Sequence, residues 1–173
     1  YDPDAARKLL ADAGYPNGFE VAMNCPNDRY VNDSRICQSV AANLSRVGVK
    51  INLVAETKIS YFPKILRRDT SFYMLGWTAS TVDAHNVLYP IMSSPGEGGR
   101  GQFNLGAYSN PKVDELLAAA GKEPVLAKRK AMYSQMQKIV VDECPVAFLL
   151  EFNFNMAFNA KVQNRPAGIW GLV

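Results

Sequence analysis

Apolar and polar residues alternate in two short stretches of this chain, and between them the apolar residues recur at helical spacing. The alternation predicts strands at residues 19–23 and 49–55. The helical spacing predicts a helix that begins at Asn32 or Asp33 and ends at Gly48. A strand–helix–strand order with a crossover of this length favours parallel pairing with a right-handed connection. The pattern therefore predicts an α/β fold.

Capping residues and prolines predict several further elements. The Asp-Pro pair at 2–3 and the Asn-Pro pair at 110–111 each place an N-cap acceptor before a proline, which is a typical helix start. A longer helix starts at Pro124 and ends at Cys144, because the residue before a proline is disfavoured in helical geometry. The other expected elements are a short helix at 62–68 and strands at 72–75, 146–152 and 154–158. Together they predict a mixed sheet flanked by helices.

The strand at 72–75 leads into a loop of small polar groups. Its continuous apolar run is typical of a strand buried on both faces, and it breaks at Gly76. Open α/β sheets bind ligands at the carboxyl ends of their strands, and an aromatic ring beside hydroxyls and a carboxylate suits a polar organic molecule. The candidate ligand-binding residues here are Trp77, Ser80, Thr81, Asp83 and His85.

Other interpretations of this loop stay open. It is also typical of a surface loop that Trp77 anchors to the core, with Asp83 as the N-cap of the following helix. His85 is the only histidine, and Ser80 and Asp83 lie within five residues of it. Catalytic triads usually gather their members from separate loops. We therefore expect a binding site without catalytic residues, and a small hydrolase using His85 with Ser80 or Asp83 is the alternative.

Two arginines outside this loop are further candidates for ligand contact. Arg29 follows the first strand and so lies at the same sheet edge as Trp77, although an ordinary surface charge is the alternative. Arg100 lies in segment 93–106, which is rich in Gly and Ser and which we expect to be a long mobile loop. The glycines are not a P-loop, because no Lys-Ser/Thr pair follows them and no helix starts directly behind them.

Composition narrows the classes of function. With 173 residues, 48% of them hydrophobic, the chain can build one sizeable core. The net charge is only +3 and the basic residues are scattered over predicted helix faces, which argues against nucleic-acid binding. No apolar run is long enough to cross a bilayer. Three cysteines without a CxxC pair, and a single histidine, predict no metal site and no cofactor. A Cys25–Cys37 disulfide is compatible with the predicted elements, but we expect three buried free thiols.

Five blocks of sequence, in order and at similar spacing, resemble the C-terminal lobe of the extracytoplasmic solute-binding proteins of family 5, the peptide, oligopeptide and nickel class. The blocks are YDPDAARKLLADAGYPNG, NDRYVNDSRICQSVAANLSRVGVKINL, FYMLGWTAS, FNLGAYSNPKVDELLAAA and RKAMYSQMQKIVVDECPVAFLL. The resemblance implies one lobe of a two-lobe clamp that closes around a peptide-like or other polar solute in the periplasm. It implies an ABC transporter permease as partner, with membrane contact only through the transporter or through an anchor absent from this sequence.

The resemblance also suggests how the chain is divided. Residues 1–159 correspond to the ligand-binding lobe, and residues 160–173 to a tail or to the start of a crossover to the second lobe. Because the sequence opens at Tyr1, without a Met and already at a helix start, we expect it to be a piece of a longer protein.

One position departs from the family pattern. Family members that bind peptides typically carry an Asp three residues after the Trp, and this Asp pairs with the α-ammonium group of the peptide. Here that position is Ser80. A neutral hydroxyl cannot replace the ion pair, so we expect ligands without an obligatory α-ammonium, unless Asp83 supplies the charge.

Overall fold

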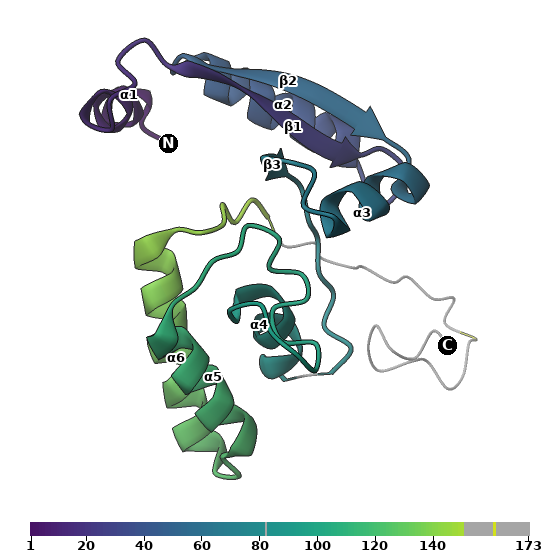
Figure 1. Cartoon of the computed structure of the whole chain (residues 1–173), viewed down its shortest axis with the longest axis vertical. Helices are drawn as coiled ribbons and strands as arrows, with labels where there is room; N and C mark the ends of the chain where they lie inside the picture. Colours follow the sequence, from purple (N-terminus) through teal and green to yellow (C-terminus); the bar gives the residue numbers. More distant parts are fainter. Residues whose placement is uncertain (82, 151–160, 162–173) are drawn as a thin grey trace.

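The computed structural model describes residues 1–81, 83–150 and 161, and its centre is a parallel sheet of three strands in the order β2-β1-β3 (Figure 1). Strand β1 (Phe19–Pro26) pairs along its whole length with β2 (Val49–Glu56), and its carboxyl half pairs with the short β3 (Phe72–Tyr73). The predicted α/β class and the parallel pairing of the first two strands are confirmed.

A helix covers one face of this sheet, whereas the opposite face carries the exposed side chains of Glu20, Lys50 and Asn52 and is covered only near the carboxyl ends of the strands. Helix α2 (Asp33–Ser45) packs on one face, where Met23, Cys25 and Cys37 form a buried cluster. Helix α3 (Lys58–Leu66) contributes Tyr61 and Ile65 to a second buried cluster. The run at 72–75 is shared between the two, because Phe72 and Met74 pack against the first cluster, whereas Tyr73 and Leu75 pack against the second. This run is thus covered on both faces, as its composition predicts.

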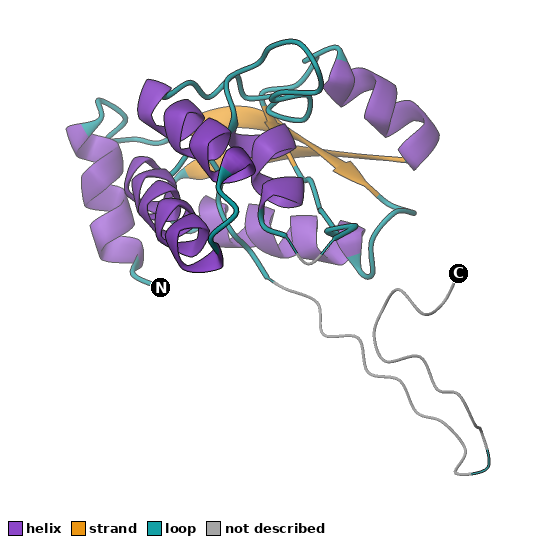
Figure 2. Ribbon diagram, turned by 90° about the horizontal axis from the view of Figure 1, so that it is seen from below, coloured by secondary structure: helices purple, strands orange, loops and turns teal. Residues whose placement is uncertain are grey.

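A helical layer follows the sheet in the chain. It consists of α4 (His85–Met92), α5 (Pro111–Lys122) and α6 (Leu126–Glu143), and α5 and α6 lie side by side (Figure 1 and Figure 2). Its buried core includes Met92, Val113, Leu116, Leu117, Ala120, Tyr133, Met136 and Val140. Among the described residues, no helix is both long enough and apolar enough to span a bilayer.

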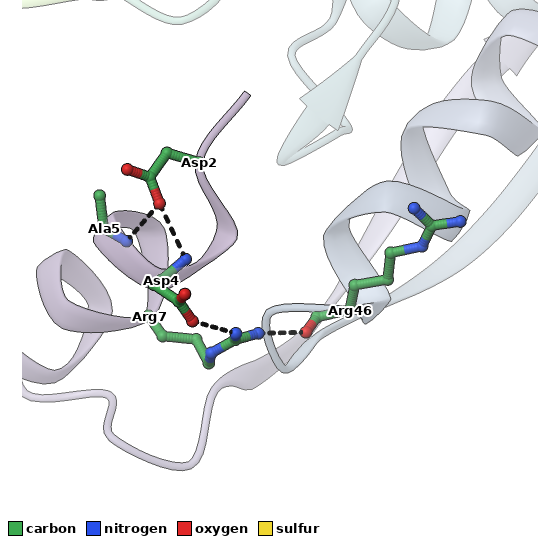
Figure 3. A network of polar contacts seen from close by, with 5 residues as sticks. All are labelled: Asp2, Asp4, Ala5, Arg7 and Arg46. Carbon is green, nitrogen blue, oxygen red and sulfur yellow. Dashed lines mark hydrogen bonds and ion pairs between the residues drawn. The ribbon is translucent and has the colours of Figure 1, made fainter.

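The first helix, α1 (Pro3–Asp12), is attached mainly by polar contacts (Figure 3). The Asp2 carboxylate caps it by accepting from the backbone N–H groups of Asp4 and Ala5 at 3.1 and 3.0 Å. Arg7 donates to the Arg46 carbonyl at the end of α2, at 2.9 Å. No residue of α1 is buried, so the helix start was predicted correctly but its apolar stripe does not enter the core.

The end of the described chain departs from the prediction. Residues 146–150 follow the end of α6 and form no strand. The rest of the expected strand at 146–152 and the strand at 154–158 lie outside the described residues. Within the described residues the sheet is purely parallel, rather than mixed.

The prediction of three buried free thiols is wrong. Cys25 and Cys37 are fully buried and form a disulfide, and Cys144 is exposed and free. The pairing follows from the fold: the carboxyl end of β1 meets the second turn of α2 with the two Cα atoms 6.5 Å apart, inside the range a disulfide spans.

The expected mobile loop at 93–106 is instead compact. The amides of Gly101 and Phe103 donate to the carbonyls of Tyr89 and Pro90 at the end of α4, at 3.2 and 2.9 Å. The side chain of Asn104 is almost fully buried and donates to the carbonyls of Ser93 and Tyr108. The loop closes on itself because one amide side chain satisfies backbone groups at both of its ends.

Hydrogen exchange tests this packing. We expect the amides of Gly101 and Phe103 to exchange at least about tenfold more slowly than those of Gly98 and Gly99 in the same loop, which donate no hydrogen bond within the described part of the chain. Equal exchange rates across the four amides would show that the loop opens freely.

Candidate functional site

The candidate site lies where the chain leaves the sheet after β3. Two tyrosine hydroxyls support this stretch of backbone: Tyr61 donates to the Met74 carbonyl, and Tyr30 donates to the Gly76 carbonyl at 3.2 Å. A Cβ added to Gly76 would lie 2.7 Å from Cε1 of the Tyr30 ring, so this position has no room for a side chain. The segment that carries Trp77 therefore starts from a fixed backbone.

Trp77 is half-buried and packs against the loop at 93–106. Its ring meets that of Phe103 edge-to-face, with the centroids 5.0 Å apart. Its Nε1 atom is buried and has no hydrogen-bond partner among the described residues. Trp77 thus anchors the loop, as one interpretation of the sequence has it, and it also keeps an indole N–H without a partner.

Asp33 organises the loop that follows β1. Its carboxylate accepts from the backbone amides of Arg29, Tyr30 and Ser34 at 2.9, 3.0 and 2.7 Å, and its residue is only 3% exposed. Burial raises the pKa of this carboxyl, but the three amide donors outweigh burial and hold the pKa below its ordinary value. Arg29 lies over the Tyr30 ring at 5.0 Å. Arg29 and Trp77 lie at the same edge of the sheet, and Tyr30 lies between them: its ring contacts Arg29, and its hydroxyl donates to the Gly76 carbonyl directly before Trp77.

The polar residues after Trp77 build the start of α4. The Ser80 amide donates to Oδ1 of Asn86 at 2.8 Å, and the Asp83 amide donates to Oγ1 of Thr81 at 3.3 Å. Oδ1 of Asp83 in turn accepts from the His85 amide at 2.9 Å. The N-cap of α4 is Ala84 rather than Asp83, so the expected N-cap role of Asp83 is wrong, although its carboxylate holds the first amide of the helix from one residue further back.

The charge of Asp83 is also neutralised from α6. Its carboxylate forms an ion pair with Arg129 and accepts from the Tyr133 hydroxyl at 3.3 Å. Sequence reasoning missed both partners. Arg129 and Tyr133 stand four residues apart on one helix face, but no local signal shows that this face meets the loop.

His85 sits in an apolar setting. Its ring stacks on Tyr89 with the centroids 4.8 Å apart, and Gly121 packs closely against it. Burial lowers the pKa of His85, the Asp83 charge raises it, and the Arg129 charge lowers it, so the net shift is downward. Among the described residues, no hydrogen bond joins the imidazole to Ser80 or Asp83, and Nδ1 has no partner. The arrangement is not that of a catalytic triad.

Arg100 lies apart from this group. Arg100 folds over Gly96, whose amide donates to the Arg100 carbonyl at 3.0 Å. Among the described residues, the only cation–π contacts are those of Arg29 with Tyr30 and of Arg129 with Tyr133, so Arg100 makes none with Trp77. A cleft of about 360 Å³ lies between one face of α2 and residues 149–150, and a hollow of about 150 Å³ lies beside Asp83 and Arg129. In the described part of the chain, no three His, Cys, Asp or Glu residues form a group that could hold a metal.

Comparison with known proteins gives the family. Residues 1–99 match the model of the bacterial extracellular solute-binding proteins, family 5 (middle region). Heme-binding protein A of Haemophilus influenzae is 30% identical over 153 residues, which cover 84% of this chain and 26% of that protein. Glutathione-binding protein GsiB of Escherichia coli K12 is 31% identical over 150 residues, covering 84% of this chain and 29% of that protein.

A solved structure agrees with the sequence relatives. The periplasmic binding protein DppA of Helicobacter pylori, in complex with the peptide STSA, superposes with a TM-score of 0.76 at 25% identity, covering 84% of this chain and 28% of that one. The chain belongs to the bacterial extracellular solute-binding proteins of family 5, and the resemblance read from the sequence is confirmed. This is a family of solute-binding proteins rather than of enzymes, and the chain spans less than a third of the length of these relatives.

The Asp33 network predicts a stability that depends on pH. Asp33→Asn cannot accept all three amides, and we expect it to lower the free energy of unfolding at pH 7 by ~2 kcal/mol. Because the pKa of Asp33 is lowered in the folded state, its contribution is present above the unfolded value and fades as the pH falls below about 4.

Urea denaturation of both proteins between pH 2.5 and 7 measures this difference. Asp142→Asn, on the exposed side of α6, is the matched control. A difference between Asp33→Asn and the unaltered chain that does not change with pH would contradict the role of the carboxylate.

Proposed function

We propose that this chain is a ligand-binding lobe of the substrate-binding component of an ABC importer. It captures a peptide-like or other polar small solute outside the cytoplasm by closing against a second lobe, and it delivers the solute to a membrane permease. Residues 1–159 make up the lobe, with 160–173 as a tail or crossover. Membership of family 5 supports this proposal, and so does a match that covers less than a third of each relative.

The observation that carries the proposal is the placement of Trp77. It follows the β3 strand at the edge where parallel sheets bind ligands, on backbone held by Tyr30 and Tyr61. Trp77 supplies an apolar wall, and the hydroxyls of Ser80 and Thr81 supply polar contacts. Trp77 lines neither the cleft beside α2 nor the hollow beside Asp83, and in this proposal a second lobe completes the site around its ring.

The remaining candidates take supporting roles in this proposal. Asp83 and His85 shape the start of α4, because the carboxylate is engaged by Arg129 and the imidazole is packed against Tyr89. Arg29 lies at the border of the site, where it packs on Tyr30. Arg100 folds over Gly96, and in this proposal it contacts a solute only from the edge of the site. We infer that the chain performs no bond chemistry, because its family is one of solute-binding proteins.

Ser80 points to the class of ligand. The relatives are named for heme and glutathione or hold a peptide, so the family accommodates varied solutes. Asp83, the acid of this segment, already pairs with Arg129. We infer that the ligand needs no free α-ammonium: a sugar, a blocked or modified peptide, or another polar molecule.

Calorimetry on two forms of the protein tests the lobe assignment. The isolated chain loses about half the contacts and the exclusion of water that strengthens polar ones. We expect it to fold but to bind the solute of the complete protein at least roughly a hundredfold more weakly. Equal affinities would place the whole site within this chain.

A second prediction concerns charge at position 80. Ser80→Asp in the complete protein adds a carboxylate beside Trp77, and we expect it to shift preference from N-acetyl-Met-Leu to free Met-Leu by roughly tenfold. Ser80→Asn is the neutral control. Tight binding of free Met-Leu by the unaltered protein that also survives Asp83→Asn would contradict the inferred ligand class.

A further inference from the structure

We propose that Tyr30 is a positioning residue for Trp77: it fixes the Gly76 backbone from a loop that the Cys25–Cys37 disulfide and Asp33 hold rigid. Tyr30 follows β1, whereas Gly76 follows β3, and these two strands are neighbours in the sheet. The ligand-binding importance of this contact rests on the proposed function, but the contact itself does not.

The Tyr30 side chain fits closely against Gly76. The Tyr30 hydroxyl satisfies the Gly76 carbonyl at 3.2 Å. The face of Gly76 is covered by the same ring, since three ring carbons lie between 2.7 and 3.1 Å from the position a Cβ would take. A hydrogen bond and a steric contact therefore act on the residue directly before Trp77.

The loop that carries Tyr30 is held in place at several points. The disulfide joins residues separated by 12 positions and so closes the loop covalently. Asp33, almost fully buried, holds the amides of Arg29 and Tyr30. At the start of the loop, the Asn27 amide donates to the Glu56 carbonyl at the end of β2, at 2.9 Å. The disulfide and these hydrogen bonds therefore restrict the movement of the backbone that carries Tyr30.

Without the Tyr30 side chain, the backbone before Trp77 loses one of its supports. Trp77 keeps its contact with Phe103, which belongs to a separate loop. The Gly76 carbonyl loses its hydroxyl donor, and Gly76 gains space to rotate. Trp77 should then sample more orientations, although the sheet and its two clusters remain intact.

Acrylamide quenching of tryptophan fluorescence measures this directly. The chain has two tryptophans, so Trp170→Phe leaves Trp77 as the single reporter. We expect Tyr30→Ala to raise the quenching constant about twofold, and Tyr30→Phe, which keeps the ring, to raise it less. Tyr15→Phe is the matched control with no change, because Tyr15 lies against Phe19, with the two rings tilted, at the opposite end of β1.

A double-mutant comparison separates this role from general loosening. Gly76→Ala should raise the quenching constant because its methyl group collides with the Tyr30 ring. In the Tyr30→Ala background the ring is gone, so Gly76→Ala should add little. Additive effects of Gly76→Ala and Tyr30→Ala on the quenching constant, or no change in any variant, would overturn the positioning role. If Tyr30→Ala or Gly76→Ala does not fold, the quenching constant of Tyr30→Phe decides whether the hydroxyl positions Trp77.

The outcome is independent of the proposed function because quenching needs no ligand. If the quenching constants do not change as expected, Tyr30 does not position Trp77, and the proposal that the chain is a ligand-binding lobe is unaffected. If the pattern appears while Tyr30→Ala leaves solute binding by the complete protein unchanged, Tyr30 still positions Trp77, and Trp77 is not the ligand wall.

Discussion

The structure depends on the parallel pairing of β1 with a strand on each side. Parallel strands all point the same way, so the loops after β1 and β3 emerge at one edge although 46 residues separate Tyr30 from Gly76. Packing of α2 on one face and α3 on the other then fixes that edge. Trp77 and the loop of Tyr30 meet because of this topology.

Backbone leaving a sheet must find new hydrogen-bond partners, and here tyrosine hydroxyls provide them at Met74 and Gly76. The described residues hold four buried side-chain polar atoms without partners: Trp77 Nε1, His85 Nδ1, Ser93 Oγ and Arg129 Nε. Two belong to the Trp77 segment, and Arg129 pairs with Asp83 of the same segment. Such atoms are uncommon in folded proteins, and three of these four lie in or against the segment that follows β3.

Local signals predicted the elements well, because caps and alternation act within a few residues. The N-caps at Asp2 and Asn110 are present, and so are the two longer strands. The disulfide, the compact loop closed by Asn104 and the Arg129–Asp83 pair were missed. Each of these depends on which surfaces meet in the folded chain, and sequence spacing does not contain that information.

The central claim is that Trp77 forms the wall of a solute site. Native mass spectrometry of the complete protein, purified without denaturation, tests it most directly. The account predicts one small polar solute bound per protein, lost in Trp77→Ala and retained in Phe103→Leu, which keeps an apolar support behind the indole. A solute that stays bound in Trp77→Ala, or a complete protein that never carries one, would contradict it.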